Sequence, residues 1–210
     1  MIRSNLSILL AERGLKITKV AKETGISRTT LTALSNNYGQ GIQFDTLNTL
    51  CMYLKVTPNQ LLSFVPVDVH LKGCDLEIKE DRLTDSLCIT EVELSDGSGE
   101  YECHMFGSVF YRLDDNEILS MDVVFDVFDV EADDIEKDPG LNKYLIYERN
   151  CLVRIFSQLS DPFLADLEEK ISEMILKALL TSVELENDGY LVNAECYIKV
   201  KFSNELRGKK

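Results

Sequence analysis

The sequence contains no C-x-x-C pair, no long apolar run and only two histidines. Its six cysteines stand apart from one another and therefore predict neither a structural zinc site nor a disulfide framework. Cys103 and His104 come nearest to a metal-binding pair, but neighbouring residues of a strand point to opposite faces. We therefore expect reduced thiols, no metal and no cofactor. No signal peptide or membrane-spanning stretch is visible, which predicts a cytoplasmic protein.

Catalytic and RNA-binding signatures are missing as well. The chain has no phosphate-cradling glycine loop, no G-x-S-x-G and no H-E-x-x-H. It also has no aromatic-rich basic groove and no glycine–arginine tract of the kind that binds RNA or single strands. We expect a protein that is not an enzyme.

Charge is distributed very unevenly along the chain. Residues 1–66 hold seven Lys or Arg and three acids, a net charge of +4, whereas the whole chain carries −14. Residues 67–210 therefore carry −18. Double-stranded DNA would attract the first part and repel the second. The partition predicts two domains, 1–66 and 67–210.

Residues 17–37 (ITKVAKETGISRTTLTALSNN) have the spacing of a helix-turn-helix. Ala21 is small enough for two helices to cross closely, and Gly25 suits a turn that requires positive φ. Ser27 is a suitable N-cap for the second helix. Leu31 and Leu34, three residues apart, should face inward and pack on the first helix.

The outward face of this second helix is the candidate DNA-reading surface. One arginine and several short polar side chains suit the edges of bases in a major groove. We expect base contacts from Arg28, Thr29 and Thr32. The residues expected to hold the phosphate backbone are Thr18, Lys19, Lys22, Ser27 and Asn36.

The stretch SRTTLTAL, followed by QFDTLNTLCMYLKVTPNQLL, resembles the lambda-repressor/Cro-like (XRE) helix-turn-helix family, especially repressors of temperate phages and related mobile elements. Further helices are expected at residues 5–13, 45–54 and 57–64, which implies an all-α head of five helices. Many family members open the motif with a glutamine that braces the DNA contact. Here Ile17 stands at that position, so the clamp on the DNA should differ.

Beyond Pro66 the apolar period changes to about two, which predicts strands at residues 67–79, 86–94, 101–111, 118–130 and 190–202. Two amphipathic helices are expected between the last two strands, at 141–159 and from Asp161 onward. We expect an α+β domain in which an antiparallel sheet has one acidic solvated face and two helices on its apolar face. The acidic residues 131–139 read as a solvated loop, and 203–210 as a disordered tail.

The resemblance implies a sequence-specific repressor that binds a double-stranded DNA operator. The leucines of the head are needed inside, so we expect the head to have no spare apolar surface. We therefore expect the acidic domain to form the homodimer and to receive an inducing partner such as an antirepressor. Two alternatives remain open. The acidic domain could capture another protein, by imitating nucleic acid for example, while the head regulates its own gene. It could also bind a small molecule.

Overall fold

The structure, a computed structural model, describes residues 1–38, 41–77, 86–113, 119–127, 139–186 and 196–208. The chain separates into two compact units, Met1–Val65 and Pro66–Lys210, which we call the head and the body. Pro66, which we had assigned to the head, is thus the first residue of the body. Three residues, 65–67, connect the last strand of the head to the first strand of the body.

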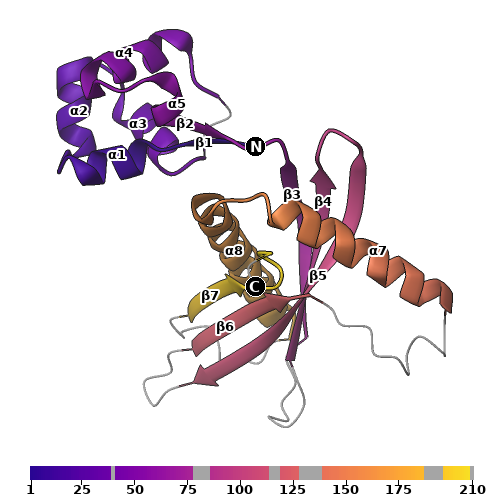
Figure 1. The fold of residues 1–210 in the computed structure, drawn as a ribbon. Helices are drawn as coiled ribbons and strands as arrows, with labels where there is room; N and C mark the ends of the chain where they lie inside the picture. The colour runs from indigo at the N-terminus through magenta and orange to yellow at the C-terminus, as the bar shows by residue number, and fades with distance from the viewer. Residues whose placement is uncertain (39–40, 78–85, 114–118, 128–138, 187–195, 209–210) are drawn as a thin grey trace. The chain divides into compact units, whose positions relative to one another are not determined.

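The head contains five helices in the expected order (Figure 1). Their apolar sides meet in one core, and burial of these side chains is what holds such short helices together. The last helix begins as its sequence suggests, because Pro58 occupies the first helical position and the side chain of Gln60 accepts a 2.9 Å bond from the Thr57 N–H. The helices are α1 (Leu6–Glu12), α2 (Ile17–Thr24), α3 (Arg28–Ser35), α4 (Phe44–Leu54) and α5 (Pro58–Leu61). The buried core residues are Leu6, Leu9, Leu10, Val20, Leu31, Leu34, Leu50, Leu54 and Leu61.

The head is not all-α, as the sequence had suggested. Strands β1 (Ile2–Ser4) and β2 (Leu62–Phe64) pair antiparallel, with Ile2 opposite Phe64 and Ser4 opposite Leu62. The N–H of Val65 extends this ladder to the Met1 carbonyl at 3.0 Å. Residues 2–4 find their backbone partners some sixty positions away, a pairing that no local pattern signals.

The head also exposes more apolar surface than we expected. Phe44 and Met52 are 87% and 73% exposed, and Ile2 and Phe64 are 71% and 70% exposed. Phe44 and Met52 are eight residues apart on α4 and therefore lie on the same side of that helix. The expectation that the head has no spare apolar surface was wrong, because eight leucines and Val20 form the buried core and leave these four side chains outside it.

The body is built on one five-stranded sheet in the order β3-β4-β5-β6-β7. Neighbours from β3 to β6 pair antiparallel, as predicted, but β7 pairs parallel to β6, so the sheet is mixed. The long helical connection between β6 and β7 returns the chain to the end of the sheet where β6 began, which makes a parallel pair possible. The strands are β3 (Asp68–Glu77), β4 (Ser86–Ser95), β5 (Glu100–Leu113), β6 (Leu119–Asp126) and β7 (Cys196–Phe202).

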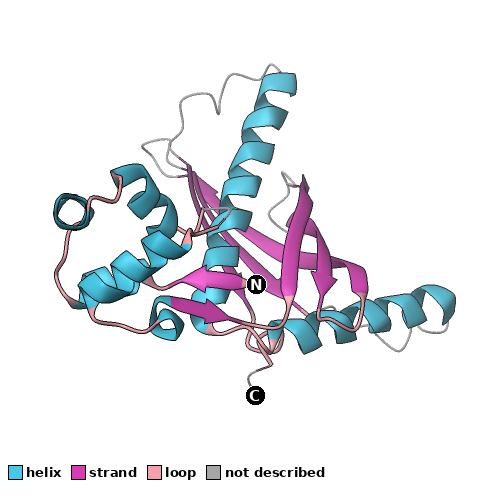
Figure 2. Ribbon diagram, turned by 90° about the horizontal axis from the view of Figure 1, so that it is seen from above, coloured by secondary structure: helices cyan, strands magenta, loops and turns pink. Residues whose placement is uncertain are grey.

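Two helices pack against this sheet in different ways (Figures 1 and 2). Helix α8 (Asp161–Glu186) contacts both edge strands, β3 and β7, and buries Leu164, Leu167, Ile171 and Ile175. Helix α7 (Pro139–Phe156) packs along β5 instead. The described part of β6 pairs only with residues 106–113 of β5, which leaves the edge of 100–105 for α7. The prediction that both helices cover the apolar face therefore describes α8. It does not describe α7, which packs along β5.

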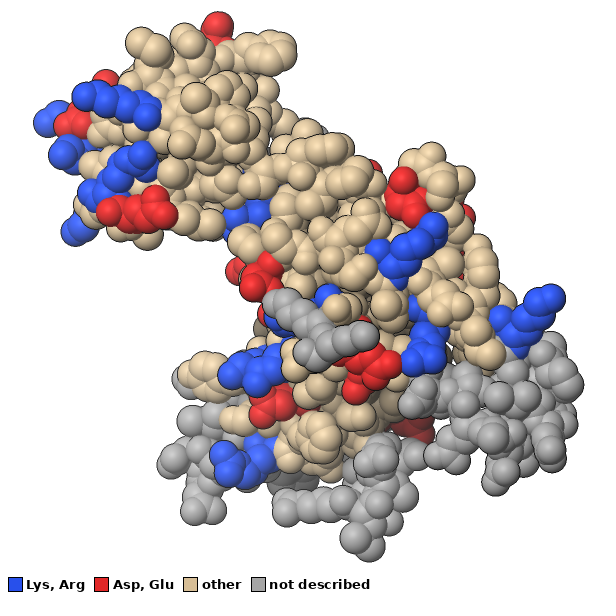
Figure 3. Space-filling model, viewed as in Figure 1, with Lys and Arg blue, Asp and Glu red and all other residues tan. Residues whose placement is uncertain are grey.

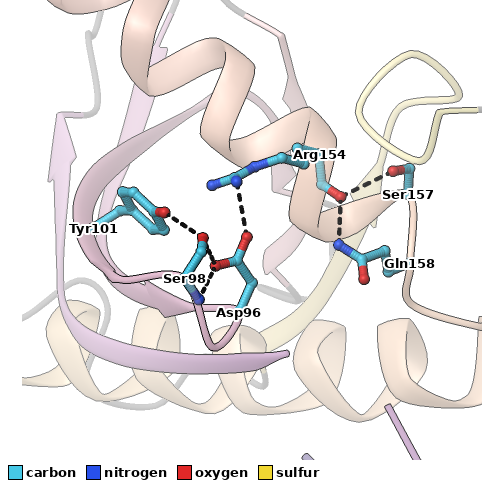
Figure 4. Close-up of polar contacts among 6 residues, drawn as sticks. All are labelled: Asp96, Ser98, Tyr101, Arg154, Ser157 and Gln158. Carbon is cyan, nitrogen blue, oxygen red and sulfur yellow. Dashed lines mark hydrogen bonds and ion pairs between the residues drawn. The ribbon is translucent and has the colours of Figure 1, made fainter. Parts of the chain in front are cut away.

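A short polar network fixes the C-terminal turn of α7 to the β4–β5 turn (Figure 4). The Arg154 guanidinium meets the Asp96 carboxylate at 2.9 Å and lies 4.9 Å from the centre of the Tyr101 ring. Asp96 also accepts a bond from the Ser98 hydroxyl at 2.6 Å. The hydrogen bonds from Ser98, followed by the charge of Arg154, hold the pKa of Asp96 below its ordinary value. This network joins two elements whose sequence separation is nearly sixty residues.

The opposite face of the sheet is acidic but not purely solvated. Glu91, Glu102, Asp122 and Asp126 are exposed there, as expected. Phe110 on the same face is 61% exposed, so an aromatic ring stands among these acids. Half-buried apolar side chains continue around it. They are Leu87, Ile89, Phe106 and Val124.

The end of the chain is ordered as far as Gly208, contrary to expectation. Leu206 is 1% exposed, and the Ser203 N–H donates to the Phe125 carbonyl at 2.8 Å. The Arg207 guanidinium donates to the Glu168 carboxylate of α8 at 2.5 Å. One apolar anchor and the ion pairs of Arg207 with Glu168 and Asp161 and of Glu205 with Arg149 hold these residues. The polar composition of the segment had concealed these contacts. Of the expected acidic loop at 131–139, residues 131–138 lie outside the described residues, and Pro139 is the first residue of α7.

The cysteines whose side chains the structure describes, Cys51, Cys74, Cys88, Cys103 and Cys151, are all free. Burial raises the pKa of Cys103 to about 12, so this thiol stays protonated at neutral pH. His104, beside it, bonds the buried Glu148 of α7 at 3.0 Å. Within the described ranges no group of three or more His, Cys, Asp or Glu is arranged to hold a metal ion. None of the described helices combines the length and the apolar character needed to cross a membrane.

Candidate DNA-binding surface

Helices α2 and α3 are joined by a three-residue turn whose geometry matches the sequence prediction. Gly25 has φ of 76°, a left-handed conformation that ends α2, and its N–H donates to the Ala21 carbonyl at 3.0 Å. Ser27 then starts α3, because its hydroxyl oxygen accepts a 3.0 Å bond from the Thr30 N–H. Both predictions, the positive φ and the N-cap, are confirmed.

The two helices of the motif pack as predicted. Val20 of α2 and Leu31 of α3 are fully buried, and Leu34 is 8% exposed. Ala21 lies half-buried at the crossing of the two helices. This packing fixes which side of α3 faces outward. The reading helix is therefore held by its apolar side and presents its polar side to solvent.

Arg28, Thr29 and Thr32, the predicted base-contacting residues, are all exposed on α3. Asn36, at the C-cap of the helix, is also exposed. The hydroxyl of Ser27 is already engaged in capping α3, so its contribution to a phosphate would be shared with that role. These positions are geometrically free to meet DNA, and the individual contacts remain predictions.

The remaining predicted residues, Thr18, Lys19 and Lys22, are exposed on α2. Figure 3 shows the basic side chains of the head gathered on the side of α1 and α2. Exposed Arg13 and Lys16, which we had not named, extend the series Arg13, Lys16, Lys19, Lys22 at a regular spacing of three. That spacing was visible in the sequence and was the signal that could have found them. These exposed cations, which form a row in the sequence from the end of α1 through α2, suit a phosphate backbone.

Helix α2 lacks the glutamine that many family members carry at its first position, and a hydrogen bond to α4 braces its other end. Ile17 is half-buried and packs against the core of the head, so this position offers no polar brace. The Tyr53 hydroxyl of α4 donates to the Glu23 carboxylate at 2.5 Å instead. This bond raises the pKa of Tyr53 and ties the end of α2 to α4. Helix α4 therefore holds the end of α2 through this bond.

The C-terminal end of α3 is tied to the small sheet through Asn37, a residue that sequence reasoning did not single out. Asn37 has φ of 56°, a left-handed conformation that asparagine tolerates better than most residues. Its side-chain oxygen accepts a 2.7 Å bond from the Ser4 N–H, and its side-chain nitrogen donates to the Ser4 carbonyl at 3.4 Å. One side chain thereby connects the reading helix to β1.

The head thus has the geometry of a helix-turn-helix domain that presents a polar helix beside a row of cations. Residues 5–67 match the model of the Cro/C1-type HTH DNA-binding domain. The head is therefore a DNA-binding domain of the XRE-like helix-turn-helix regulators. The chain is also similar to the uncharacterized HTH-type transcriptional regulator YozG of Bacillus subtilis (strain 168), at 28% identity over 60 residues, 29% of this chain and 71% of that protein. No solved structure matches the chain significantly.

Proposed function

We propose that this protein is a transcriptional repressor that binds a specific double-stranded DNA operator. The observation that carries the proposal is the exposed face of α3, where Arg28, Thr29 and Thr32 stand together beside the cationic side of α2. An arginine on such a helix reads guanine through two parallel hydrogen bonds in the major groove. The lysines and Arg13 hold the phosphates and carry no sequence information themselves.

We further propose that two chains bind together and that the body joins them. One small head reads too few base pairs to select a site in a genome. A two-fold dimer binds two half-sites at once, so the number of base pairs that are read doubles. A dimer in which β7 pairs with β7 of a second chain is disfavoured. A two-fold axis at Lys199 would place the Lys199 side chains of the two chains opposite each other, and their like charges would repel. The outer face around Phe110, with its half-buried apolar neighbours, suits a second copy better.

From the resemblance to repressors of temperate phages, we further propose that the protein belongs to a phage or mobile element. We also propose that it acts in the cytoplasm without metal, cofactor or enzymatic activity. An antirepressor or another protein relieves repression by binding the acidic body, away from the DNA.

An alternative function is that of an interaction protein whose body captures another protein while the head regulates its own gene. The observation that favours it is the exposed aromatic side of α7, where Tyr144 and Tyr147 are 48% and 52% exposed and Ile146 is 41% exposed. Tyrosine is frequent at the centres of protein interfaces. The strong negative charge of the body is compatible with a basic partner.

Selection from a random pool of duplexes tests the repressor proposal. The whole chain should enrich one palindromic sequence, and placing that sequence over a reporter promoter should lower expression when the protein is present. Arg28→Ala should weaken both effects and relax the enriched sequence at one base pair, while Asn48→Ala, a change at an exposed position of α4, should leave both unchanged. Failure of the wild-type chain to enrich any sequence contradicts the proposal and favours the interaction protein.

A further inference from the structure

The end of the reading helix α3 is not held on all sides by packing. A groove of about 400 Å³ separates it from the small sheet. Ala33 and Leu34 of α3 line one wall, and Ile2 of β1 and Leu62 of β2 line the other. A groove of this size leaves side chains without partners across it, so dispersion contacts do not set the distance between helix and sheet.

Asn37 bridges this groove. It directly follows the Asn36 C-cap, and both of its side-chain bonds end on the backbone of Ser4. The bond that Ser4 N–H donates is short, at 2.7 Å. Since these bonds run from the short Asn37 side chain to the backbone of Ser4, and not between two long flexible side chains, they restrict the position of the helix end more than a surface side-chain contact would.

The other side of the bridge is firmly built. β1 pairs with β2 over three residues, and Asn5 adds a bond from its N–H to the Leu61 carbonyl at 2.8 Å. The Asn5 side chain donates to the Ser63 hydroxyl at 2.8 Å as well. Asn37 therefore anchors α3 to a small sheet that is itself tied to the end of α5.

We propose that Asn37 is a positioning residue for DNA reading: it sets the tilt of α3 in the major groove without touching the DNA. The proposal rests on the proposed function, because it assigns a role in the same reading event. Loss of the bridge frees the C-terminal end of α3 to shift toward or away from the groove. Base contacts depend on the placement of α3 and should weaken, whereas phosphate contacts from α2 should stay.

The test compares Asn37→Ala, Asn37→Gly and Asn37→Asp in the full chain. The probes are the duplex selected by the wild-type chain and a scrambled duplex of the same composition. Asn37→Gly keeps the left-handed backbone but loses both bonds, and Asn37→Asp keeps the acceptor for the Ser4 N–H. Asn37→Ala and Asn37→Gly should lower affinity for the selected duplex by about tenfold, the equivalent of one or two lost hydrogen bonds. Affinity for the scrambled duplex and the salt dependence should not change, and Asn37→Asp should recover most of the loss.

A second readout separates this proposal from the proposed function. Hydrogen exchange of the Ser4 amide should be slow in the wild-type chain and in Asn37→Asp, and fast in Asn37→Ala and Asn37→Gly. If the wild-type chain selects no sequence, the proposed function fails and the role of Asn37 in DNA reading fails with it, while the exchange data still show whether Asn37 holds the end of α3 to β1. An equal fall in affinity for both duplexes overturns the proposal, as does unchanged Ser4 exchange in Asn37→Ala.

Discussion

At the scale of single residues, the DNA-binding surface divides into side chains that read and side chains that hold. Arg28 is exposed at the start of α3, one turn before the buried Leu31, while Lys22 is exposed on α2. These two positions sit on different helices and meet different chemical groups of the duplex. Substitutions at the two sites should therefore weaken binding in different ways.

Arg28→Ala should cost about 1–3 kcal/mol at the selected site and relax the preference at one base pair, because a bidentate contact to a base is lost. The measurement is a gel-shift titration against the selected duplex and its single-base variants. Unchanged affinity and unchanged preference would show that α3 is not the reading helix.

Lys22→Ala should weaken binding to all sequences alike, because a phosphate contact carries no sequence information. The slope of log affinity against log salt should become shallower by about one. Titrations at several salt concentrations, with Lys55→Ala on the left-handed cap of α4 as the comparison, measure this slope. A change in base preference in Lys22→Ala would contradict the division between reading and holding.

At the scale of elements, local sequence signals predicted those features that depend on near neighbours. The turn at Gly25, the N-cap at Ser27 and the alternation in β5 and β6 all follow from spacing within a few residues. The strand β1 and the parallel pairing of β7 depend on partners far along the chain. Alternation of side chains is the same in parallel and antiparallel strands, so it could not reveal the direction of β7.

Prediction of the candidate DNA-binding surface from the sequence was limited in the same way. The exposed face of α3 followed from the burial of Leu31 and Leu34, both close in sequence. The bridge from Asn37 to Ser4 spans 33 positions, and no spacing rule connects an asparagine after a helix with a strand near the start of the chain. Long-range hydrogen bonds of this kind are recognised only once the fold is known.

The network that attaches α7 to the β4–β5 turn should make the body sensitive to acid. The folded-state pKa of Asp96 lies below its ordinary value of 3.8, so ionised Asp96 stabilises the body above that value. This stabilisation is lost as the pH falls from about 4 through the folded-state pKa. Asp96→Asn should therefore lower the melting temperature at pH 7 and reduce the further loss between pH 5 and pH 3.

Thermal unfolding at a series of pH values checks this prediction. Asp75→Asn, which removes an exposed carboxylate of β3, serves as the matched control and should follow the wild-type pH profile. A wild-type pH profile in Asp96→Asn would show that the ion pair with Arg154 contributes nothing to the attachment of α7.

At the scale of the whole molecule, a head of net charge +4 precedes a body of net charge −18. DNA should attract the first and repel the second, so we expect the body to contribute to binding by holding two heads together. We expect residues 1–66 to be monomeric and the whole chain to be dimeric by light scattering. The fragment should bind the palindromic duplex at least about tenfold more weakly, because it loses the second tethered head.

Phe110→Asp tests whether the proposed dimer interface lies around Phe110. Tyr147→Asp, which places the same charge at another exposed aromatic position on α7, is the control. The first should give a monomer that binds DNA as weakly as the fragment, and the second should stay dimeric. Equal mass and affinity for the fragment and the whole chain would remove the body from DNA recognition. If the fragment is itself dimeric, the dimer interface lies in the head, for example at the exposed Phe44 and Met52 of α4.

Only three residues, 65–67, connect β2 to β3, and one of them is Pro66. Three residues of extended chain span at most about 10 Å, so this connection can change little in length. In a dimer this short tether permits very few separations between the two heads. Inserting five base pairs at the centre of the selected palindrome turns one half-site by about half a helical turn. The wild-type chain should then bind no better than it binds a single half-site, while a chain with ten Gly-Ser residues inserted after Pro66 should tolerate both spacings. The short connection would thus make operator geometry, as well as operator sequence, a condition for repression.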